Sequence, residues 1–311
     1  MRNDSQFFVS DKNSTNQPLN DFKDHLITFK REDLLNKDIS GNKFRKLKYN
    51  IAHAKEESYS GLLTFGGAFS NHLAAVATAG KRYGFKTIGI VRGEEWKEKM
   101  EQSRTLLFCK EQGMECYFVS REDYRLKEKG ILVKELISCL KTIYVIPEGG
   151  TNALAVKGCK EILTDGDANF DVVCCCVGTG GTIAGLIESA QPHQTVMGFA
   201  ALKHKTLASD IGQFTSKTNW ILNHDYTFGG YAKVSNDLIA FMNDFYQQYE
   251  IPLDPIYTGK MVFGIFDLIK NKKWQWGKKI LIIHSGGLQG IQGMNSQLQK
   301  KGYPTIHYAS E

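Results

Sequence analysis

Residues 172–182 read VVCCCVGTGGT, and this stretch decides the fold. Its first six residues are apolar and end at a glycine-rich turn, a pattern typical of a strand buried in a parallel sheet. Apolar residues with helical spacing follow the turn. The turn therefore lies at the carboxyl edge of the sheet, where backbone N–H groups bind anions. The stretch predicts an α/β chain with an anion site directly after the strand.

The turn has the composition of a phosphate site. Glycine lets the backbone approach a ligand, consecutive N–H groups form an anion-binding nest, and threonine hydroxyls can donate further hydrogen bonds. We expect a phosphate to be held by Gly178, Thr179, Gly180, Gly181 and Thr182. Two other interpretations are a plain tight turn and a dinucleotide fold. The Gly-x-Gly-x-x-Gly spacing is met only loosely, however, and no acidic residue stands on a following strand.

The rest of the chain repeats this alternation of strand, glycine-bounded turn and helix. We expect strands at residues 62–65, 87–91, 115–119, 143–146, 172–177, 195–200 and 279–284. We expect helices at residues 44–57, 71–83, 103–111, 156–163, 183–189, 236–249 and 262–270. The lack of a flexible linker predicts two closely packed domains with a small-molecule site between them.

Size and charge argue against several classes of protein. The chain has 311 residues, enough for about two domains. Its net charge of +6 is modest, and the lysines are spread along the chain, so we do not expect nucleic-acid binding. No apolar run reaches the ~20 residues of a membrane helix, and the polar first 24 residues do not resemble a secretory signal. We therefore expect a cytoplasmic protein without a membrane partner.

The seven cysteines lack the paired Cys-x-x-Cys spacing of zinc and redox sites. Cys174, Cys175 and Cys176 alternate between the faces of a predicted strand, so they cannot all reach one metal ion. We expect reduced thiols in the core and no metal site.

A lysine at a helix start is the candidate reactive group. Residues 40–47 read SGNKFRKL, so a glycine-bearing turn leads into a helix with Lys43 at its start. The positive end of the helix dipole and partial desolvation lower the pKa of such an amine, whose neutral form can make a Schiff base with an aldehyde cofactor. The alternative is a solvated helix face, because Arg45, Lys46 and Lys48 are also basic.

Two further glycine-rich turns follow predicted strands. Ser70 and Asn71 stand at a helix start after a double glycine, where they cap the helix or also hold a ligand carboxylate. His72, in the same first turn, is either a ligand-binding residue or an ordinary surface or satisfied polar residue. Ser285, after the strand at 279–284, either caps a helix or lines the ligand edge of the sheet.

Six short motifs, considered together, are far more specific than any one of them. In chain order they are Gly41-Asn42-Lys43-x-Arg45-Lys46-Leu47, Gly66-Gly67-x-x-Ser70-Asn71, Pro147-Glu148-Gly149-Gly150-Thr151-Asn152, Gly178-Thr179-Gly180-Gly181-Thr182, Asp254-Pro255-x-Tyr257-Thr258-Gly259-Lys260 and His284-Ser285-Gly286-Gly287. This ordered set resembles the pyridoxal-phosphate-dependent D-cysteine desulfhydrase and 1-aminocyclopropane-1-carboxylate (ACC) deaminase family. The resemblance spans about residues 29–287, nearly the whole chain.

The resemblance implies a tryptophan synthase β-like α/β fold (fold type II) with two domains, twisted and mostly parallel sheets, and pyridoxal phosphate in the interdomain cleft. Residues 1–47 and 149–311 would form a large cofactor-binding domain, and residues 48–148 would form an inserted smaller domain. The ligand partner would be a small-molecule amino acid, and the protein would be a homodimer.

The resemblance also implies roles for single residues. Lys43 would carry the cofactor covalently and would act in catalysis together with Ser70 and Tyr257. The other cofactor contacts would come from Asn71, Gly178, Thr179, Gly180, Gly181, Thr182 and Ser285. The substrate contacts would come from Ser70, Asn71, His72, Tyr231 and Tyr257.

Two positions separate the activities within the family. The ACC deaminases that this chain resembles carry a glutamate immediately after the tyrosine of the Asp-Pro-x-Tyr motif, where this chain has Thr258. Ser285 would then face the pyridine nitrogen, and a neutral hydroxyl makes the cofactor a weaker electron sink than a carboxylate does. Elimination of a good β-leaving group tolerates the weaker sink, whereas opening a cyclopropane without an α-hydrogen demands more.

The sequence therefore predicts a lyase that releases pyruvate, ammonia and sulfide from D-cysteine or a related D-amino acid with a β-leaving group. Three other hypotheses stay open. The chain could be an ACC deaminase of the same fold, a non-catalytic phosphate- or nucleotide-binding protein, or a β-replacement enzyme such as a cysteine synthase.

Overall fold

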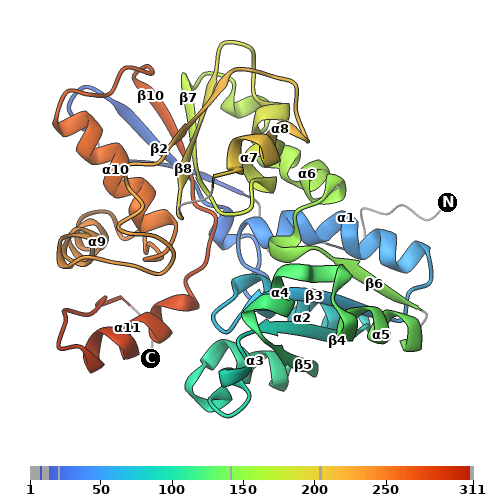
Figure 1. Ribbon diagram of the computed structural model, residues 1–311. Coiled ribbons are helices and arrows are strands. Elements are labelled where there is room, and N and C mark those ends of the chain that lie inside the picture. Colours follow the sequence, from blue (N-terminus) through green and yellow to red (C-terminus); the bar gives the residue numbers. More distant parts are fainter. Residues whose placement is uncertain (1–7, 9–13, 20–21, 141, 203–204, 309–311) are drawn as a thin grey trace.

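The computed structural model describes residues 8, 14–19, 22–140, 142–202 and 205–308. Its strands form two sheets (Figure 1). The larger sheet has the order β1-β2-β10-β7-β8-β9, and only the pairing of β1 with β2 is antiparallel. Its strands are β1 (Asn16–Pro18), β2 (Leu26–Lys30), β7 (Val172–Val177), β8 (Thr195–Ala200), β9 (Trp220–Asn223) and β10 (Lys279–Ile283).

The smaller sheet is entirely parallel, in the order β5-β4-β3-β6. Its strands are β3 (Gly61–Gly67), β4 (Lys86–Arg92), β5 (Met114–Val119) and β6 (Ile143–Ile146). The two mostly parallel sheets confirm the predicted α/β fold class.

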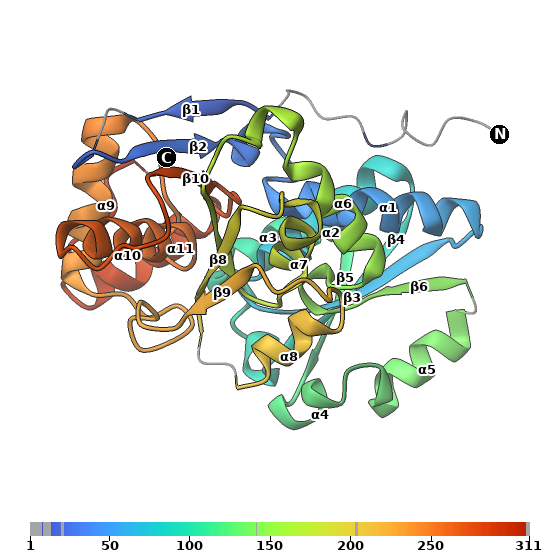
Figure 2. The same ribbon diagram turned by 90° about the horizontal axis from the view of Figure 1, so that it is seen from above.

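Helices cover both faces of each sheet, as parallel strands require. On the larger sheet, one side carries α9 (Asn236–Tyr249) and α10 (Thr258–Lys270), and the other carries α6 (Ala153–Cys159), α7 (Gly181–Ser189) and α8 (Leu207–Gly212) (Figures 1 and 2). On the smaller sheet, one side carries α1 (Asn42–Glu56), α2 (Asn71–Tyr83) and α3 (Arg104–Glu111), and the other carries α4 (Arg121–Leu126) and α5 (Ile131–Leu140). Residues of α11 (Gly290–Lys300) pack in the same core as α9 and α10.

All seven predicted strands are present, with ends within two residues of the prediction. The short strands β1, β2 and β9 and the helices α4, α5, α8 and α11 were not predicted. The helix predicted at 156–163 begins earlier, because the Asn152 side chain caps it at Ala155, and its last turn tightens to a 3₁₀ helix, Lys160–Ile162. The predicted domain boundary at residue 47 falls inside α1, whose Leu47 and Ile51 pack in the core of the smaller sheet.

The central strand β7 shows the alternation that its sequence predicts. Cys174 and Cys176 face the core formed with α9 and α10, whereas Cys175 faces the core formed with α6 and α7. All seven cysteines are free, as predicted, but the expectation that all lie in the core was wrong, because Cys139 is exposed on α5 and Cys116 is only half-buried. Within the described residues, no three His, Cys, Asp or Glu side chains are placed to hold a metal ion.

None of the described helices is both long enough and apolar enough to cross a membrane.

A buried ion pair fastens the edge of the larger sheet to the segment before β7. The Lys30 ammonium lies 2.7 Å from a carboxylate oxygen of Asp167, and Asn16 donates a hydrogen bond of 2.7 Å to the other oxygen. Burial raises the pKa of the Asp167 carboxyl, but hydrogen bonds from Lys30, Asn16 and the Thr164 backbone outweigh it, so that this pKa lies below its usual range.

We predict that Asp167→Ala lowers the free energy of unfolding by about 3–5 kcal/mol, because it leaves the buried Lys30 ammonium unpaired. Urea denaturation measures this, with the exposed Asp165→Ala in the same turn as the control. Because the pKa of Asp167 is lowered in the folded state, its stabilisation is complete at neutral pH and disappears as the pH falls through that lowered value. Equal stability of the two variants at neutral pH would contradict the prediction.

Candidate active site

A cavity of ≈ 1120 Å³ lies between the loops at the carboxyl ends of strands from both sheets. Eleven of the twelve predicted site residues line it. They are Lys43, Ser70, Asn71, His72, Gly178, Thr179, Gly180, Thr182, Tyr231, Tyr257 and Ser285. Gly181 is buried in the first turn of α7, next to lining residues of the same glycine-rich turn. The fold thus brings together residues that are up to 242 positions apart in the sequence (43 and 285).

Lys43 occupies the first turn of α1, and Gly41 is the residue that allows this placement. Gly41 caps the helix at φ 61°, a left-handed conformation that favours glycine. A Cβ atom at this position would lie 1.9 Å from the Ser285 carbonyl oxygen, which also accepts a hydrogen bond of 3.2 Å from the Asn42 N–H. The start of α1 is therefore seated directly against the loop that carries Ser285.

The Lys43 amine is suited to nucleophilic chemistry. It donates a hydrogen bond of 3.0 Å to the Asn42 side chain at the wall of the cavity. Burial lowers its pKa, although the nearby Cys176, Cys159 and Asp254 act in the opposite direction. The neutral amine, which is the nucleophilic form, is therefore favoured relative to an exposed lysine.

Lys46 was not predicted as a site residue, and it lies three positions after Lys43 on the same side of α1. Its side chain is only 3% exposed. Its ammonium donates hydrogen bonds to the Gly149 carbonyl at 2.8 Å and to the Thr151 hydroxyl at 3.0 Å. Burial and then the charge of Lys43 lower its pKa to about 7. The i, i+3 spacing of the two lysines was the available signal, because residues three apart lie on one helix face.

The solvated-face interpretation of this basic stretch is wrong for its inner members. Arg45 forms two hydrogen bonds with the buried Glu32, at 2.8 and 3.0 Å. Lys48 lies further out and pairs with Glu161 at 2.7 Å. The helix thus presents Lys43 and Lys46 to the cavity and uses Arg45 and Lys48 as structural cations.

The turn after β7 has the features of a phosphate site. Gly180 caps α7 at φ 86°, and no side chain among the described residues caps this helix start. The N–H groups of its first turn are therefore available to an anion. The Thr182 hydroxyl accepts a hydrogen bond of 2.8 Å from Asn42, and the Thr179 hydroxyl lies 3.4 Å from the Lys46 ammonium. An uncapped helix start beside a buried ammonium fits a phosphate group.

Ser70 and His72 belong to the start of α2. Ser70 caps the helix by accepting a hydrogen bond from the Leu73 N–H, and it also lines the cavity. His72 is buried, so the surface interpretation is wrong. The Thr64 hydroxyl donates its proton to the Ile146 carbonyl, so at its contact with His72 Nε2 it must accept. His72 Nδ1 makes no hydrogen bond of good geometry with the described residues, and the nearby Pro147 carbonyl raises the pKa of the ring.

His72 is held in its neutral form. Burial, followed by the charges of Lys43 and Lys46, lowers its pKa well below the ordinary value. The neutral ring lines the cavity wall beside Gly150.

Tyr257 and Tyr231 form an aromatic pair, with ring centroids 6.4 Å apart in an edge-to-face arrangement. Burial raises the pKa of both phenols, so both are neutral proton donors at physiological pH. Lys260 fixes the loop before Tyr231 through hydrogen bonds to the Thr227 and Gly230 carbonyls, at 2.9 and 2.8 Å. The Tyr257 phenol is hydrogen-bonded to the Tyr231 phenol, and both side chains line the cavity.

Ser285 does not cap a helix, because α11 begins five residues later at Gly290 with Gln289 before it. Its side chain lines the cavity, where its hydroxyl lies 3.0 Å from the Cys176 thiol. Of the two interpretations of Ser285, the structure supports the one that places it at the ligand edge.

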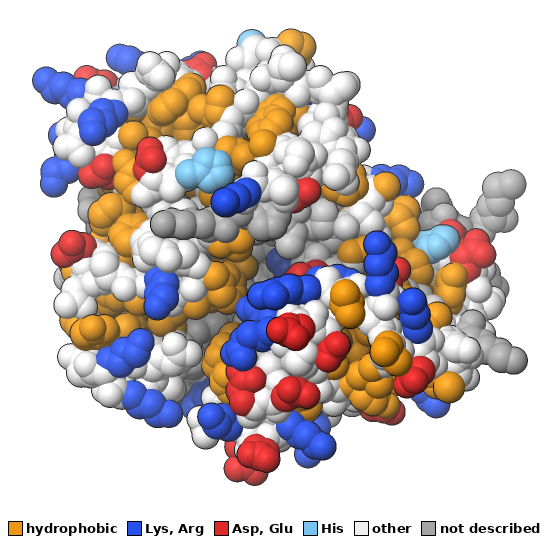
Figure 3. Space-filling view, in the orientation of Figure 1, with side chains coloured by type: hydrophobic (Ala, Val, Ile, Leu, Met, Phe, Trp, Pro, Cys, Tyr) orange, Lys and Arg blue, Asp and Glu red, His pale blue; other side chains and the backbone are white. Residues whose placement is uncertain are grey.

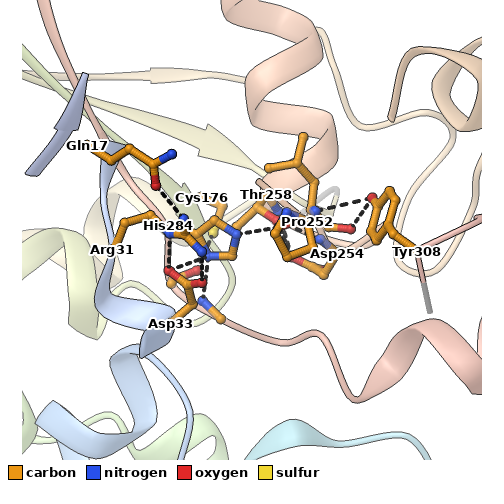
Figure 4. Close-up of polar contacts among 12 residues, drawn as sticks. Gln17, Arg31, Asp33, Cys176, Pro252, Asp254, Thr258, His284 and Tyr308 are labelled. Carbon is orange, nitrogen blue, oxygen red and sulfur yellow. Dashed lines mark hydrogen bonds and ion pairs between the residues drawn. The ribbon is translucent and has the colours of Figure 1, made fainter. Parts of the chain in front are cut away.

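A buried polar network supports this loop from behind (Figure 4). Arg31 makes two hydrogen bonds with Asp33, at 2.9 and 2.7 Å, and one of 2.5 Å with Gln17. Asp33 lies 3.5 Å from His284 Nδ1, while His284 Nε2 donates to the Pro252 carbonyl at 2.6 Å. The first strand of the chain is thereby linked to the residue that precedes Ser285.

Thr258 is not part of the cavity wall. Its hydroxyl donates to the Asp254 carboxylate at 2.8 Å and accepts from the Asp254 N–H at 2.8 Å (Figure 4). The same carboxylate accepts three backbone hydrogen bonds from Ile256, Tyr257 and Thr258. Of the pair that we expected to set the chemistry at the pyridine nitrogen, only Ser285 lines the cavity.

Cations gather on the side of the cavity formed by the smaller sheet. Arg92, Arg121, Arg125 and Lys127 line it, and Figure 3 shows Lys and Arg side chains over the region of α4. Lys127 pairs with Glu148 at 2.8 Å, and Arg121 pairs with Glu95. Arg92 has no ion pair with any described residue, and its guanidinium lies over the Tyr124 ring. This rim favours the approach of anionic ligands.

Comparisons with known proteins agree with this geometry. A family model described as pyridoxal-phosphate dependent enzyme matches residues 13–286. The chain is 32% identical over 287 residues to a putative 1-aminocyclopropane-1-carboxylate deaminase of Pyrococcus furiosus, covering 85% of each chain. It is 28% identical over 306 residues to a bifunctional D-cysteine desulfhydrase/1-aminocyclopropane-1-carboxylate deaminase, mitochondrial, of Arabidopsis thaliana, covering 88% of this chain and 75% of that protein.

Solved structures share the fold. The crystal structure of an ACC deaminase homologue superimposes with a TM-score of 0.81 at 27% identity, covering 93% of this chain and 94% of that chain. A hydrogen sulfide-producing enzyme of Fusobacterium nucleatum superimposes with a TM-score of 0.62 at 16% identity, over 92% of this chain and 98% of that one. The second likeness concerns the fold alone.

We predict that Lys46→Met weakens the binding of pyridoxal phosphate by about 10- to 100-fold, because a charge-assisted hydrogen bond to the phosphate is lost. Lys48→Met, on the outer side of the same helix, is the control and is expected to bind the cofactor normally. The pKa of Lys46 is about 7 in the free site, so the ammonium is present below this pH and is lost above it. The difference between wild type and variant should therefore shrink as the pH rises above 7, and titration of the full chain with pyridoxal phosphate measures it. Equal affinities of the two variants would contradict the assignment.

Proposed function

This chain belongs to the pyridoxal-phosphate dependent enzyme family, and from that membership we propose that it is a lyase that releases pyruvate, ammonia and sulfide from D-cysteine. The observation that carries the proposal is the neutral Ser285 hydroxyl on the cavity wall, in the position that we assign to the pyridine nitrogen. Other D-amino acids with a good β-leaving group belong to the same proposed substrate class.

The residues present fit pyridoxal phosphate. Lys43 offers an amine whose pKa is lowered by burial for the aldehyde carbon, and Lys46 with the uncapped start of α7 offers a site for the phosphate. Asn71 and Ser285 line the cavity where they can hydrogen-bond the ring. When bound, the cofactor withdraws electrons from the α-carbon of an attached amino acid.

The partner of the ring nitrogen decides how strong that withdrawal is. A carboxylate would keep the nitrogen protonated, whereas a neutral hydroxyl such as that of Ser285 leaves the cofactor a weaker electron sink. Loss of thiolate from the β-carbon requires less stabilisation at the α-carbon than opening of a three-membered ring that carries no α-hydrogen. The neutral hydroxyl therefore supports β-elimination.

Two residues supply the proton chemistry. The Lys43 amine, whose pKa is lowered by burial, removes the proton from the α-carbon. The Tyr257 phenol, kept protonated by burial, donates a proton to the departing sulfur, with Tyr231 packed against it. Ser70 and Asn71 hold the substrate carboxylate at the start of α2, where the helix dipole favours a negative charge.

A second candidate function is ACC deaminase. The name of the Pyrococcus furiosus relative supports it, as does the name of the bifunctional Arabidopsis thaliana relative. The same Lys43 and carboxylate site would serve this reaction, so the geometry of these residues alone does not separate the two functions.

Three features that the resemblance implies stay proposals. We propose that the protein acts as a homodimer, that it works in the cytoplasm, and that residues 48–148 form a smaller domain inserted between residues 1–47 and 149–311.

We predict that Lys43→Ala reduces turnover by at least about 100-fold, since it removes both the covalent attachment point and the base at the α-carbon. The absorbance of the covalently attached cofactor should disappear in the same variant, whereas Lys48→Ala keeps both properties. Normal turnover with unchanged cofactor absorbance in Lys43→Ala would rule out the assignment.

Tyr257→Phe is expected to lower turnover of D-cysteine by about 100-fold, because the leaving thiolate loses its proton donor. The defect should be much smaller with β-chloro-D-alanine, because chloride leaves without a proton. Steady-state rates of pyruvate release with both substrates measure this. An equal loss with the two substrates would show that Tyr257 is not the acid for the leaving group.

The substrate itself is tested by presenting D-cysteine, L-cysteine and ACC separately to the cofactor-loaded protein. We expect pyruvate from D-cysteine only, and no 2-oxobutyrate from ACC. Release of 2-oxobutyrate from ACC would support the second candidate and would show that a neutral group beside the ring nitrogen is sufficient for ring opening.

A further inference from the structure

The Cys176 thiol is a buried group that the proposed reaction does not use. It lies 3.0 Å from the Ser285 hydroxyl, and both side chains line the cavity that holds Lys43. Cys176 is on β7, one residue before the strand ends, and only 7% of its surface is exposed. Figure 4 shows it in the network around His284.

The thiol carries its proton at physiological pH. Burial, and next the charge of Asp254, raise the pKa of Cys176 to about 12, and the hydrogen bond with Ser285 and the nearby Lys43 act only partly against this. The Asp254 carboxylate already accepts four hydrogen bonds, from the Thr258 hydroxyl and from three backbone N–H groups. It therefore does not compete for the thiol proton, and Ser285 is the side-chain partner that the thiol has.

The direction of this hydrogen bond decides what Ser285 offers to a ligand. A serine hydroxyl has one proton and two lone pairs. If Ser285 donated its proton to the sulfur, only a lone pair would face the cavity. If the thiol donates to the serine oxygen instead, the serine proton stays free. A pyridine nitrogen without a carboxylate partner is an acceptor, so it needs that proton.

We propose that Cys176 is a positioning residue, which donates its S–H to the Ser285 oxygen and so directs the serine proton toward the ring nitrogen of the bound cofactor. The inference rests on the role of Ser285 in the proposed function. It names Cys176 as a second residue that orients the Ser285 hydroxyl. It also explains why this hydroxyl would donate its proton to the ring nitrogen.

Cys174 provides a comparison within the same strand. It lies two residues before Cys176, so its side chain points to the same face, and it packs in the same apolar core. Cys174 is fully buried and does not line the cavity. If the thiols only filled space in the core, replacing either one should affect cofactor binding equally. If Cys176 orients Ser285, only the replacement of Cys176 should weaken binding.

The test is a double-variant cycle on the full chain, with the dissociation constant of pyridoxal phosphate and the absorbance spectrum of the bound cofactor as the readouts. Cys176→Ala is expected to weaken cofactor binding by about 3- to 10-fold, the usual effect of one hydrogen bond. In a Ser285→Ala background the same substitution should have no further effect, because its partner is gone. Cys176→Ser, which keeps a donor, should bind nearly as well as wild type, and Cys174→Ala should bind the cofactor normally.

Three results would overturn the inference. The first is that the effects of Cys176→Ala and Ser285→Ala multiply in the double variant, and the second is that Cys174→Ala weakens binding as much as Cys176→Ala. The third is that Ser285→Ala alone changes neither readout, which would remove the proposed role of Ser285 as well. If Cys176→Ala does not fold, Cys176→Val replaces it, since valine fills the space without a donor and should show the same 3- to 10-fold loss.

Discussion

The close contact between Gly41 and the Ser285 carbonyl is the constraint on which the site depends. A side chain at position 41 would collide with that carbonyl oxygen at 1.9 Å, so only glycine lets α1 begin there. This contact sets Lys43 beside the loop of Ser285, and the rest of α1 continues into the core of the smaller sheet. The start of α1 therefore holds Lys43 next to the loop of Ser285, the predicted partner of the ring nitrogen. The same helix links this loop to the core of the smaller sheet.

Two lysines in the wall of one cavity disfavour each other's charged form, and this lowers the pKa of an amine at the site. Lys43 and Lys46 lie three residues apart, and burial together with their proximity lowers the pKa of the Lys46 amine. A bound phosphate would favour the charged form of Lys46, while burial still lowers the pKa of Lys43. The neutral His72 and the protonated Tyr257 follow the same rule, since burial disfavours the charged form of each group.

Local chemistry explains how much of this could be predicted from the sequence. The long apolar strands and the glycine-rich turns are local signals, so β7, the turn after it and the Ser70 cap could be predicted from their residues alone. The spacing of Lys46 from Lys43 indicates a shared helix face, but the partners of Lys46, Cys176 and Thr258 could not be predicted, because they come from elsewhere in the fold. The Thr258 hydroxyl is held by Asp254, Lys46 reaches Gly149, and Cys176 meets Ser285 across two strands. The short strands β1 and β9 were missed because pairing with their neighbours, not an apolar run, defines them.

The proposed chemistry requires that Lys43, and not the neighbouring Lys46, holds the cofactor. Borohydride reduction of the cofactor-loaded protein, followed by mass spectrometry of its peptides, tests this most directly. We predict a pyridoxyl group on Lys43 and none on Lys46, whose amine is held by the Gly149 carbonyl and the Thr151 hydroxyl. A pyridoxyl group on Lys46, or on a lysine outside the cavity, would contradict it.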